Sequence, residues 1–253
     1  MPTPEELELN EKNLRLSDIQ NELAQFELEF ATLHGELNDF QYHYTELVVR
    51  RMYELDMIEQ QVAEYLVSTA PSSVDYREKL RAVKERISEA ENVFRSEKRR
   101  SGNGNFRPSD SLKKLYREVA RKIHPDLTTD EKERQRRGLL MAEINDAYEI
   151  GDEQKMRQIL DEWQNDPDNV QGEDIGAQLI KAIRKIAQMQ RRIAAIQEEI
   201  KILKSTEIYE LKEKVENSKK DGLDLLGQMA YYLDVQIHER GEYLKFLRTG
   251  GKG

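Results

Sequence analysis

A histidine, a proline and an aspartate directly follow a short basic segment: they are His124, Pro125 and Asp126. The imidazole and the carboxylate can make directed hydrogen bonds, and the proline restricts the loop and so lowers the cost of ordering it on binding. Between Ser111 and Ile123 five residues are basic and one is acidic, a net charge of +4 in a chain whose net charge is −9. Such a segment speeds the encounter with an acidic partner surface. The chemistry predicted here is recognition.

The basic segment has the pattern of an amphipathic helix. Ser109 is expected to cap its N-terminus, and Pro125 disfavours a helical conformation at His124, so the helix should end there. Thr128 and Glu131 have capping-box spacing and predict the start of a second helix. Apolar residues at helical spacing mark one face of each helix: Leu112, Leu115, Tyr116, Val119 and Ile123, then Leu140, Met141, Ile144, Ala147 and Tyr148. We expect two antiparallel helices with His-Pro-Asp in the loop between them.

This arrangement resembles the J-domain of DnaJ-type co-chaperones. The resemblance rests on Leu-Lys-Lys-Leu-Tyr-Arg-Glu-Val-Ala-Arg-Lys-Ile-His-Pro-Asp at 112–126, and on Glu-Ile-Asn-Asp-Ala-Tyr-Glu at 143–149, where the family has its third helix. Met141 stands where the family has Phe, and Gly151 where a Leu is usual. The first helix of the family, of the Tyr-x-x-Leu-Gly type, does not precede Ser109. Either the helix over 76–100 packs in its place, with Phe106 as a plug, or the domain is truncated.

The resemblance implies a partner and a set of contact residues. The His-Pro-Asp loop would engage a DnaK-type (heat shock 70) chaperone ATPase and stimulate its ATP hydrolysis, while the preceding basic helix docks on an acidic face of that ATPase. The residues implied for this contact are His124, Pro125 and Asp126 in the loop, with Lys113, Lys114, Arg117, Arg121 and Lys122 as docking charges. None of them is catalytic. This interpretation requires His124 and Asp126 to be accessible.

Long proline-free stretches, residues 5–70 and 168–253, flank the J-like segment. Each contains a heptad seam, in which apolar residues recur at steps of three and four. The seams consist of Leu16, Ile19, Leu23, Phe26, Phe30, Leu33, Leu37, Phe40, Tyr44 and Leu47, and of Ile175, Leu179, Ile183, Ile186, Met189, Ile193, Ile196, Ile200 and Leu203. After Leu47 the phase is less regular. Two coiled-coil helices are therefore predicted.

The two seamed helices have opposite charge. Residues 5–66 carry 15 acidic and 4 basic residues, a net of −11, whereas 175–215 carry 9 basic and 5 acidic, a net of +4. Opposite charges beside apolar seams favour pairing between the two helices. We expect an antiparallel intramolecular hairpin with residues 76–164 at its tip. Parallel homodimerisation through either seam is the alternative, and oligomers of hairpins remain open.

Composition agrees with an all-α fold in which an elongated coiled-coil stalk carries a small helical J-like domain. The chain of 253 residues is 35% charged, 38% hydrophobic and 7% aromatic, with no cysteine, a profile typical of long helices. The expected parts are an N-terminal coiled-coil helix over 1–70, a connecting helix and flexible loop over 74–107, the J-like domain over 108–164, a C-terminal coiled-coil helix over 173–219, and a helical segment with a tail over 222–253.

Other classes of function are disfavoured by the same sequence. The basic patch lacks interleaved aromatic residues and the chain is acidic overall, so nucleic acid is a poor partner. No apolar stretch reaches the length of a membrane span, and we expect a cytoplasmic, non-enzymatic protein without cofactor or metal. The alternative is a scaffolding coiled-coil protein with a degenerate J-like docking module. The client is unknown, and the apolar stretch 223–237 could bind a client, a membrane surface or the stalk itself.

Overall fold

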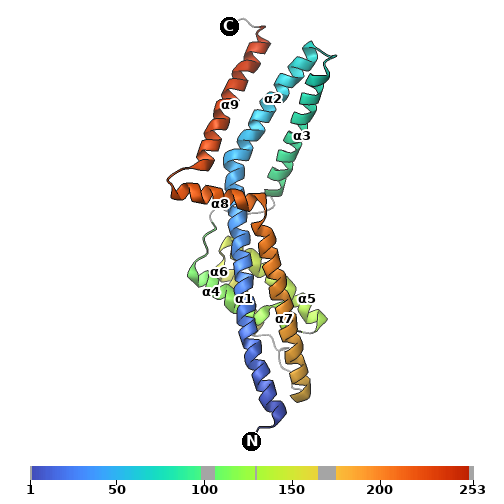
Figure 1. Ribbon diagram of the computed structural model, residues 1–253, viewed down its shortest axis with the longest axis vertical. Helices are drawn as coiled ribbons and strands as arrows, with labels where there is room; N and C mark the ends of the chain where they lie inside the picture. Colours follow the sequence, from blue (N-terminus) through green and yellow to red (C-terminus); the bar gives the residue numbers. More distant parts are fainter. Residues whose placement is uncertain (1, 98–105, 129, 165–174, 251–253) are drawn as a thin grey trace. The chain divides into compact units, whose positions relative to one another are not determined.

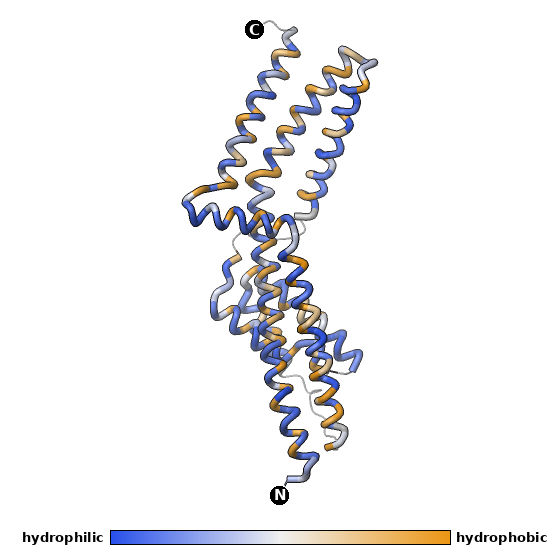
Figure 2. Tube along the Cα trace, viewed as in Figure 1, coloured by the Kyte–Doolittle hydropathy of each residue, from blue (hydrophilic) through white to orange (hydrophobic). Residues whose placement is uncertain are grey.

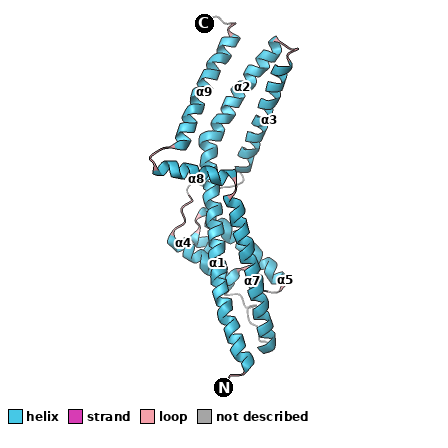
Figure 3. Cartoon of the chain, in the orientation of Figure 1, coloured by secondary structure: helices cyan, strands magenta, loops and turns pink. Residues whose placement is uncertain are grey.

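The computed structural model describes residues 2–97, 106–128, 130–164 and 175–250. These residues form helices and connecting turns, and none of them lies in a strand, so the all-α prediction is confirmed (Figure 3). Most of the flexible loop expected before residue 107 lies outside the described residues. Contacts divide the chain into two units, residues 1–37 with 105–209, and residues 38–104 with 210–253.

Helix follows helix without a turn from residue 4 to residue 69. Helix α1 (Pro4–Tyr44) passes through the π-helical segment η1 (Thr45–Val49) into α2 (Arg50–Thr69). A π-turn places an additional residue in the helix and so shifts the phase of its apolar face. This shift explains why the heptad spacing becomes irregular at Leu47.

In the first unit α1 packs against α7 (Ile175–Lys204). Figure 2 shows apolar positions recurring along both helices. Their buried contact residues are Ile19, Leu23, Leu33 and Leu37 of α1, and Ile186, Met189, Ile193, Ile196 and Ile200 of α7. Acidic α1 and basic α7 also pair directly, through Glu27 with Arg192 at 3.0 Å and Glu29 with Lys204 at 3.6 Å. Pairing of the two seams is therefore observed within one chain.

The direction of this pairing differs from the expectation. Helices α1 and α7 begin at the same end of the unit and run parallel (Figure 1), so the antiparallel hairpin was wrong. An apolar seam is buried equally well in either direction, and the seams therefore did not specify it. The expected coiled-coil segment over 173–219 comprises two helices, α7 and α8 (Glu207–Lys220), which are separated by a turn at Ser205 and Thr206.

The J-like module, residues 106–164, contains α4 (Asp110–Ile123), the 3-10 turn η2 (Pro125–Leu127), α5 (Glu131–Ile150) and α6 (Glu153–Gln164). Tyr116 near the middle of α4 contacts Asn145 and Tyr148 near the end of α5. Arg137 in the first half of α5 contacts His124 at the end of α4, so the two helices are antiparallel as predicted. The core of the module consists of Leu112, Leu115, Tyr116, Val119, Ala120, Ile123, Met141, Ile144, Ala147, Tyr148, Met156, Ile159, Leu160 and Trp163.

The ends of these helices follow local chemistry. Ser109 caps α4, because its Oγ accepts the amide of Leu112 at 3.1 Å, as predicted. The capping box at Thr128 was wrong: Asp130 caps α5, and its Oδ1 accepts the amide of Glu133 at 2.8 Å. Gly151 ends α5 with φ of 76°, a left-handed conformation that glycine adopts without strain. The left-handed conformation at the end of α5 thus explains the glycine at this position, where the resemblance led us to expect leucine.

The second unit is built around α2, which packs against α3 (Val74–Glu97) and α9 (Leu225–Arg248). Ion pairs join these helices, between Arg86 and Asp56 at 2.6 Å and between Arg51 and Asp234 at 2.8 Å. The apolar stretch 223–237 falls mostly in α9, where it contributes two buried residues to the unit; its exposed residues include Tyr231 and Tyr232. In the parts of the chain that are described, no helix has the length and apolar composition of a membrane span.

Candidate functional site at the His-Pro-Asp loop

The loop begins where α4 stops. Pro125 opens η2, and His124 leaves the helix with φ of −49° and ψ of 135°, the extended conformation that a following proline favours. Six apolar residues of α4 are buried against the module, which leaves the basic side chains on its other faces. The loop therefore lies between α4 and α5, at the end of the helical hairpin, as predicted.

His124 is buried there, at 4% exposed. Its Nε2 lies 2.9 Å from Oε1 of Glu27 in α1, and its Nδ1 accepts the backbone amide of Asp126 at 3.1 Å. Because Nδ1 is an acceptor, a neutral ring carries its proton on Nε2 and donates it to the Glu27 carboxylate. Both ring nitrogens are therefore occupied within the chain.

Glu27 is itself 5% exposed and accepts two hydrogen bonds on one oxygen. The second donor is Nε of Arg192 in α7, at 3.0 Å, while Nη1 of Arg192 donates to Glu199 at 2.9 Å. Burial raises the pKa of Glu27, but the hydrogen bond from His124 and the charge of Arg192 outweigh it, so the pKa lies below the ordinary value of 4.5. Glu27 is therefore a buried carboxylate that stays ionised at neutral pH.

Two further contacts hold the loop. Gln188 of α7 donates through Nε2 to Oδ1 of Asp126 at 2.9 Å, and the Asp126 side chain is 17% exposed. Arg137 of α5 donates to the carbonyl oxygen of His124 at 3.4 Å and stacks over the Trp163 ring, with 4.6 Å between its guanidinium carbon and the ring centroid. Helices α1, α5 and α7 thus all contribute contacts to His124 or Asp126.

The five basic residues of α4 fall into two groups, those that contact α1 and those that do not. Arg121 donates to Oδ1 of Asn21 at 3.0 Å, and Arg117 to Oε1 of Gln25 at 3.5 Å. The ammonium group of Lys122 pairs with Glu118 one turn earlier, at 2.9 Å. Lys113 is half-buried and Lys114 is exposed. Two of the residues predicted to dock on a partner therefore already contact another helix of the chain.

The expected accessibility of the loop is not found for His124. Helix α1 packs on the module instead, and its Ala24, Leu28 and Ala31 join the core. Of the two alternatives for the missing first helix, packing of the 76–100 helix on the module was wrong, since α3 belongs to the second unit. Helix α1 packs on the module because a stripe of apolar and small residues flanks Glu27 at helical spacing.

Phe106 does pack against the core as the predicted plug. Its ring lies 5.6 Å from the ring of Tyr148, centroid to centroid. A Cβ atom at Gly35 would come within 2.6 Å of the Phe106 ring, so glycine at this position lets α1 approach closely. Thr32 of the same helix is hydrogen bonded to the Tyr148 hydroxyl at 2.8 Å. Apolar and polar contacts together fix α1 on the module.

Sequence reasoning missed four residues of the site: Glu27, Arg137, Gln188 and Arg192. The sequence separation of Glu27 from His124 is 97 residues, so no local motif joins them. A signal for Glu27 was present nonetheless, because Ala24, Leu28 and Ala31 form a second small apolar stripe outside the heptad seam. A charged residue within such a stripe indicates a buried, paired group.

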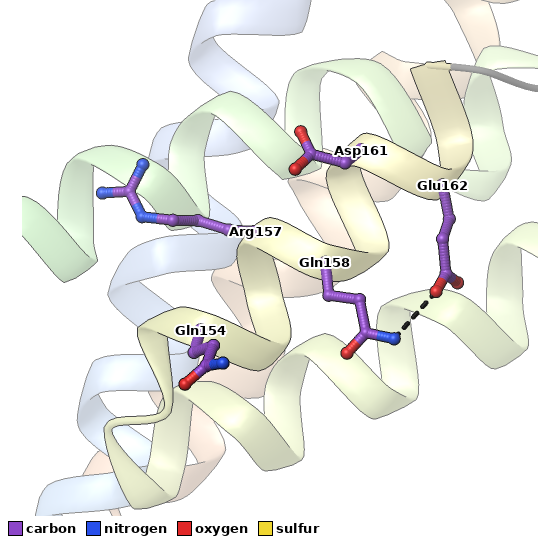
Figure 4. Close-up of a pocket in the computed structure, with 5 residues that line it drawn as sticks. All are labelled: Gln154, Arg157, Gln158, Asp161 and Glu162. Carbon is purple, nitrogen blue, oxygen red and sulfur yellow. Dashed lines mark hydrogen bonds between the residues drawn. The ribbon is translucent and has the colours of Figure 1, made fainter.

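A separate hollow lies on the surface of α6, and five polar or charged side chains line it (Figure 4). They are Gln154, Arg157, Gln158, Asp161 and Glu162. Gln158 donates to Glu162 at 2.8 Å. Because the lining comes from one helix, the hollow does not bring groups from different elements together as a ligand site does. Across the described ranges, no three metal-ligating side chains are grouped so as to hold a metal ion.

Comparison with known proteins does not add to this description. No protein-family model matches the chain, no curated protein matches it, and no solved structure matches it. The class of the protein therefore rests on its own residues: an all-α chain with a basic helix, a His-Pro-Asp loop and a second helix that close a common core.

Proposed function

We propose that the protein is a J-domain-type co-chaperone that recruits a DnaK-type chaperone ATPase and stimulates its ATP hydrolysis. The observation that carries the proposal is the hairpin of α4 and α5, which ends in His-Pro-Asp and has Lys114, Arg121 and Lys122 exposed on its basic helix. Charges of this kind favour docking on an acidic surface. The proposal places the protein in the cytoplasm, and the paired helices would direct it to a client.

The buried position of His124 sets a condition on this proposal. An imidazole that is 4% exposed cannot contact a second protein, so the contacts with α1 and α7 must open before the loop engages the ATPase. The conformation described here would then be the resting form. Without such an opening the co-chaperone function fails.

A second candidate function follows from the same contacts. If the loop stays closed, its hydrogen bonds to Glu27 and Gln188 give His124 and Asp126 a purely internal role. The protein would then be a scaffold whose J-like module buttresses the pair of α1 and α7. Both candidates predict the same fold, and they differ in their effect on a chaperone ATPase.

Single-turnover ATP hydrolysis by a DnaK-type chaperone separates the two candidates. We expect the wild-type protein, present in excess over the chaperone, to raise the rate and His124→Gln to abolish the increase. Equal rates from the wild type, His124→Gln and an opened variant, Glu27→Ala, would reject the co-chaperone function and favour the scaffold. Comparing these three proteins excludes the case in which the wild type is merely closed.

Charge reversal tests the docking face independently. Arg117→Glu combined with Arg121→Glu should weaken chaperone binding, and the loss should be largest at low ionic strength, where charges are least screened. The matched control reverses two basic residues of α6, Lys155→Glu with Arg157→Glu, which are exposed and do not belong to α4. Equal affinities of the two double variants at low salt would contradict docking through α4.

A further inference from the structure

We propose that Glu27 is the centre of an intramolecular latch, formed with Arg192 and Gln188, which holds the His-Pro-Asp loop against α1 and α7 and excludes the chaperone partner until it opens. The inference rests on the proposed function and names its regulation. It predicts that the resting protein is less active than a variant in which the latch is broken.

The latch is built from contacts that converge on the loop from two helices. Glu27 of α1 accepts from His124 at 2.9 Å, and Arg192 of α7 fixes the same carboxylate oxygen at 3.0 Å. Gln188, about one turn before Arg192 on α7, donates to Asp126 at 2.9 Å. The first and last residues of the His-Pro-Asp sequence are thus bound by side chains of two different helices, so full release of the loop requires both contacts to break.

The same part of α1 also occupies the docking face of α4. Asn21 and Gln25, on the two turns before Glu27, accept hydrogen bonds from Arg121 and Arg117. One segment of α1 therefore covers the imidazole and also contacts two of the docking arginines. Displacing this segment would free both parts of the predicted chaperone-binding surface together.

The chemistry of these contacts makes them open to competition. Asn21 and Gln25 offer neutral amide oxygens to two arginines, whereas the carboxylates of an acidic partner would make charge-assisted hydrogen bonds, which are stronger. Arg117 and Arg121 are not fully buried, so a partner could reach them while the imidazole is still closed. An acidic surface could bind there first and then displace α1 from the loop, with the ATPase itself acting as the opener.

The alternative is that Glu27 serves only to stabilise the fold. A buried ion pair is poorly suited to that role, since replacing such a pair by well-packed apolar residues is often neutral or stabilising. Ala24, Leu28 and Ala31 surround Glu27 with surface against which an apolar residue could pack. A carboxylate at this position instead gives a specific contact that depends on His124 and Arg192.

Hydrogen exchange tests the latch without a chaperone. Glu27→Ala should accelerate amide exchange in residues 121–128 about 30-fold, because the opening free energy of the loop falls. Glu29→Ala is the matched control: Glu29 lies two residues away on the same helix, and its half-exposed carboxylate pairs with Lys204. Exchange in 121–128 that is no faster in Glu27→Ala than in Glu29→Ala would overturn the latch.

ATP hydrolysis by a DnaK-type chaperone then connects the latch to function. We expect Glu27→Ala to stimulate single-turnover hydrolysis several-fold more than the wild type and Glu29→Ala, and the double variant Glu27→Ala with His124→Gln to give no stimulation. Faster exchange without stimulation by any variant would support the latch and reject the co-chaperone function. Stimulation by the wild type equal to that by Glu27→Ala would support the function and overturn the latch.

Loss of the fold must be distinguished from release of the loop. Trp163, which is 7% exposed in the core of the module, gives a fluorescence signal for folding. If Glu27→Ala unfolds the module, Glu27→Gln replaces it, because the amide keeps the size of the side chain and an acceptor oxygen but removes the charge. Wild-type exchange in 121–128 of folded Glu27→Gln would then overturn the latch, and accelerated exchange would support it.

Discussion

The hydrogen bond between His124 and Glu27 should couple the two residues energetically. Their side chains are 5% and 7% exposed, with 2.9 Å between Nε2 and Oε1. Water screens such a contact little, and a hydrogen bond to a charged group contributes about 1.5 to 3 kcal/mol to stability. We therefore expect a coupling energy of about 2 kcal/mol in a double-mutant cycle.

The cycle consists of the wild type, Glu27→Ala, His124→Ala and the double variant. The free energy of unfolding of each is obtained from urea titrations. Trp163 is the chain's one tryptophan and reports the unfolding of the J-like module in which it is buried. Glu27→Ala alone should cost more than the coupling energy, because it also leaves Arg192 without one of its two carboxylate partners.

An exposed pair on the same module supplies the reference. Lys122 and Glu118 are each 43% exposed and lie one helical turn apart, so their coupling should be about 0.3 to 0.5 kcal/mol. A coupling between Glu27 and His124 that does not exceed this reference would refute the argument. It would show that the buried contact is weak or that the loop is open in solution.

Three further predictions concern the stability of the J-like module, each measured by urea unfolding with Trp163 fluorescence. Gly35→Ala should lower the free energy of unfolding by about 1 to 3 kcal/mol, because its Cβ would overlap with the Phe106 ring. Gly138→Ala, with free space around its Cβ position, should instead stabilise α5 by about 0.5 to 1 kcal/mol. Equal effects of the two substitutions would contradict the close approach of α1 to Phe106. The pKa of Glu27 is lowered in the folded protein, so its contribution to the free energy of unfolding should be complete above pH 4.5 and be lost as pH falls through the folded pKa. Glu27→Gln should remove the pH dependence of stability that Glu27 causes. Tyr116→Phe deletes a buried hydroxyl that donates to an amide oxygen at 2.7 Å and should cost about 1 to 2 kcal/mol; an unchanged urea midpoint would show that this bond does not stabilise the module.

Features that depend on neighbouring residues could be predicted from the sequence. Ser109 as a cap, the end of α4 at Pro125 and the apolar faces of α4 and α5 follow from local sterics and helical spacing. The cap of α5 was misplaced because Thr128 and Asp130 both have suitable oxygens, and the spacing to Glu131 selected the wrong one. Local patterns thus located the hairpin and its loop but left one helix end uncertain by two residues.

Features that depend on distant residues could not be predicted in the same way. The two seams predicted that α1 and α7 pair, but an apolar stripe has no preferred direction, and the parallel arrangement depends on the connections between the helices. The burial of His124 depends on Glu27 and Arg192, which lie far from it in the chain. A functional motif can be recognised locally, whereas its accessibility is a property of the folded chain.

The parallel course of α1 and α7 has an electrostatic consequence at the helix termini. Each helix carries a partial charge of about +0.5 at its N-terminus and −0.5 at its C-terminus. Because α1 continues through η1 into α2, parallel packing brings like poles together at the N-terminal end only. Glu5 and Glu6 in the first turn of α1 offset the positive poles, and Lys201 and Lys204 in the last turn of α7 offset the negative pole of that helix. The two glutamates ease the dipole repulsion that side-by-side parallel packing creates.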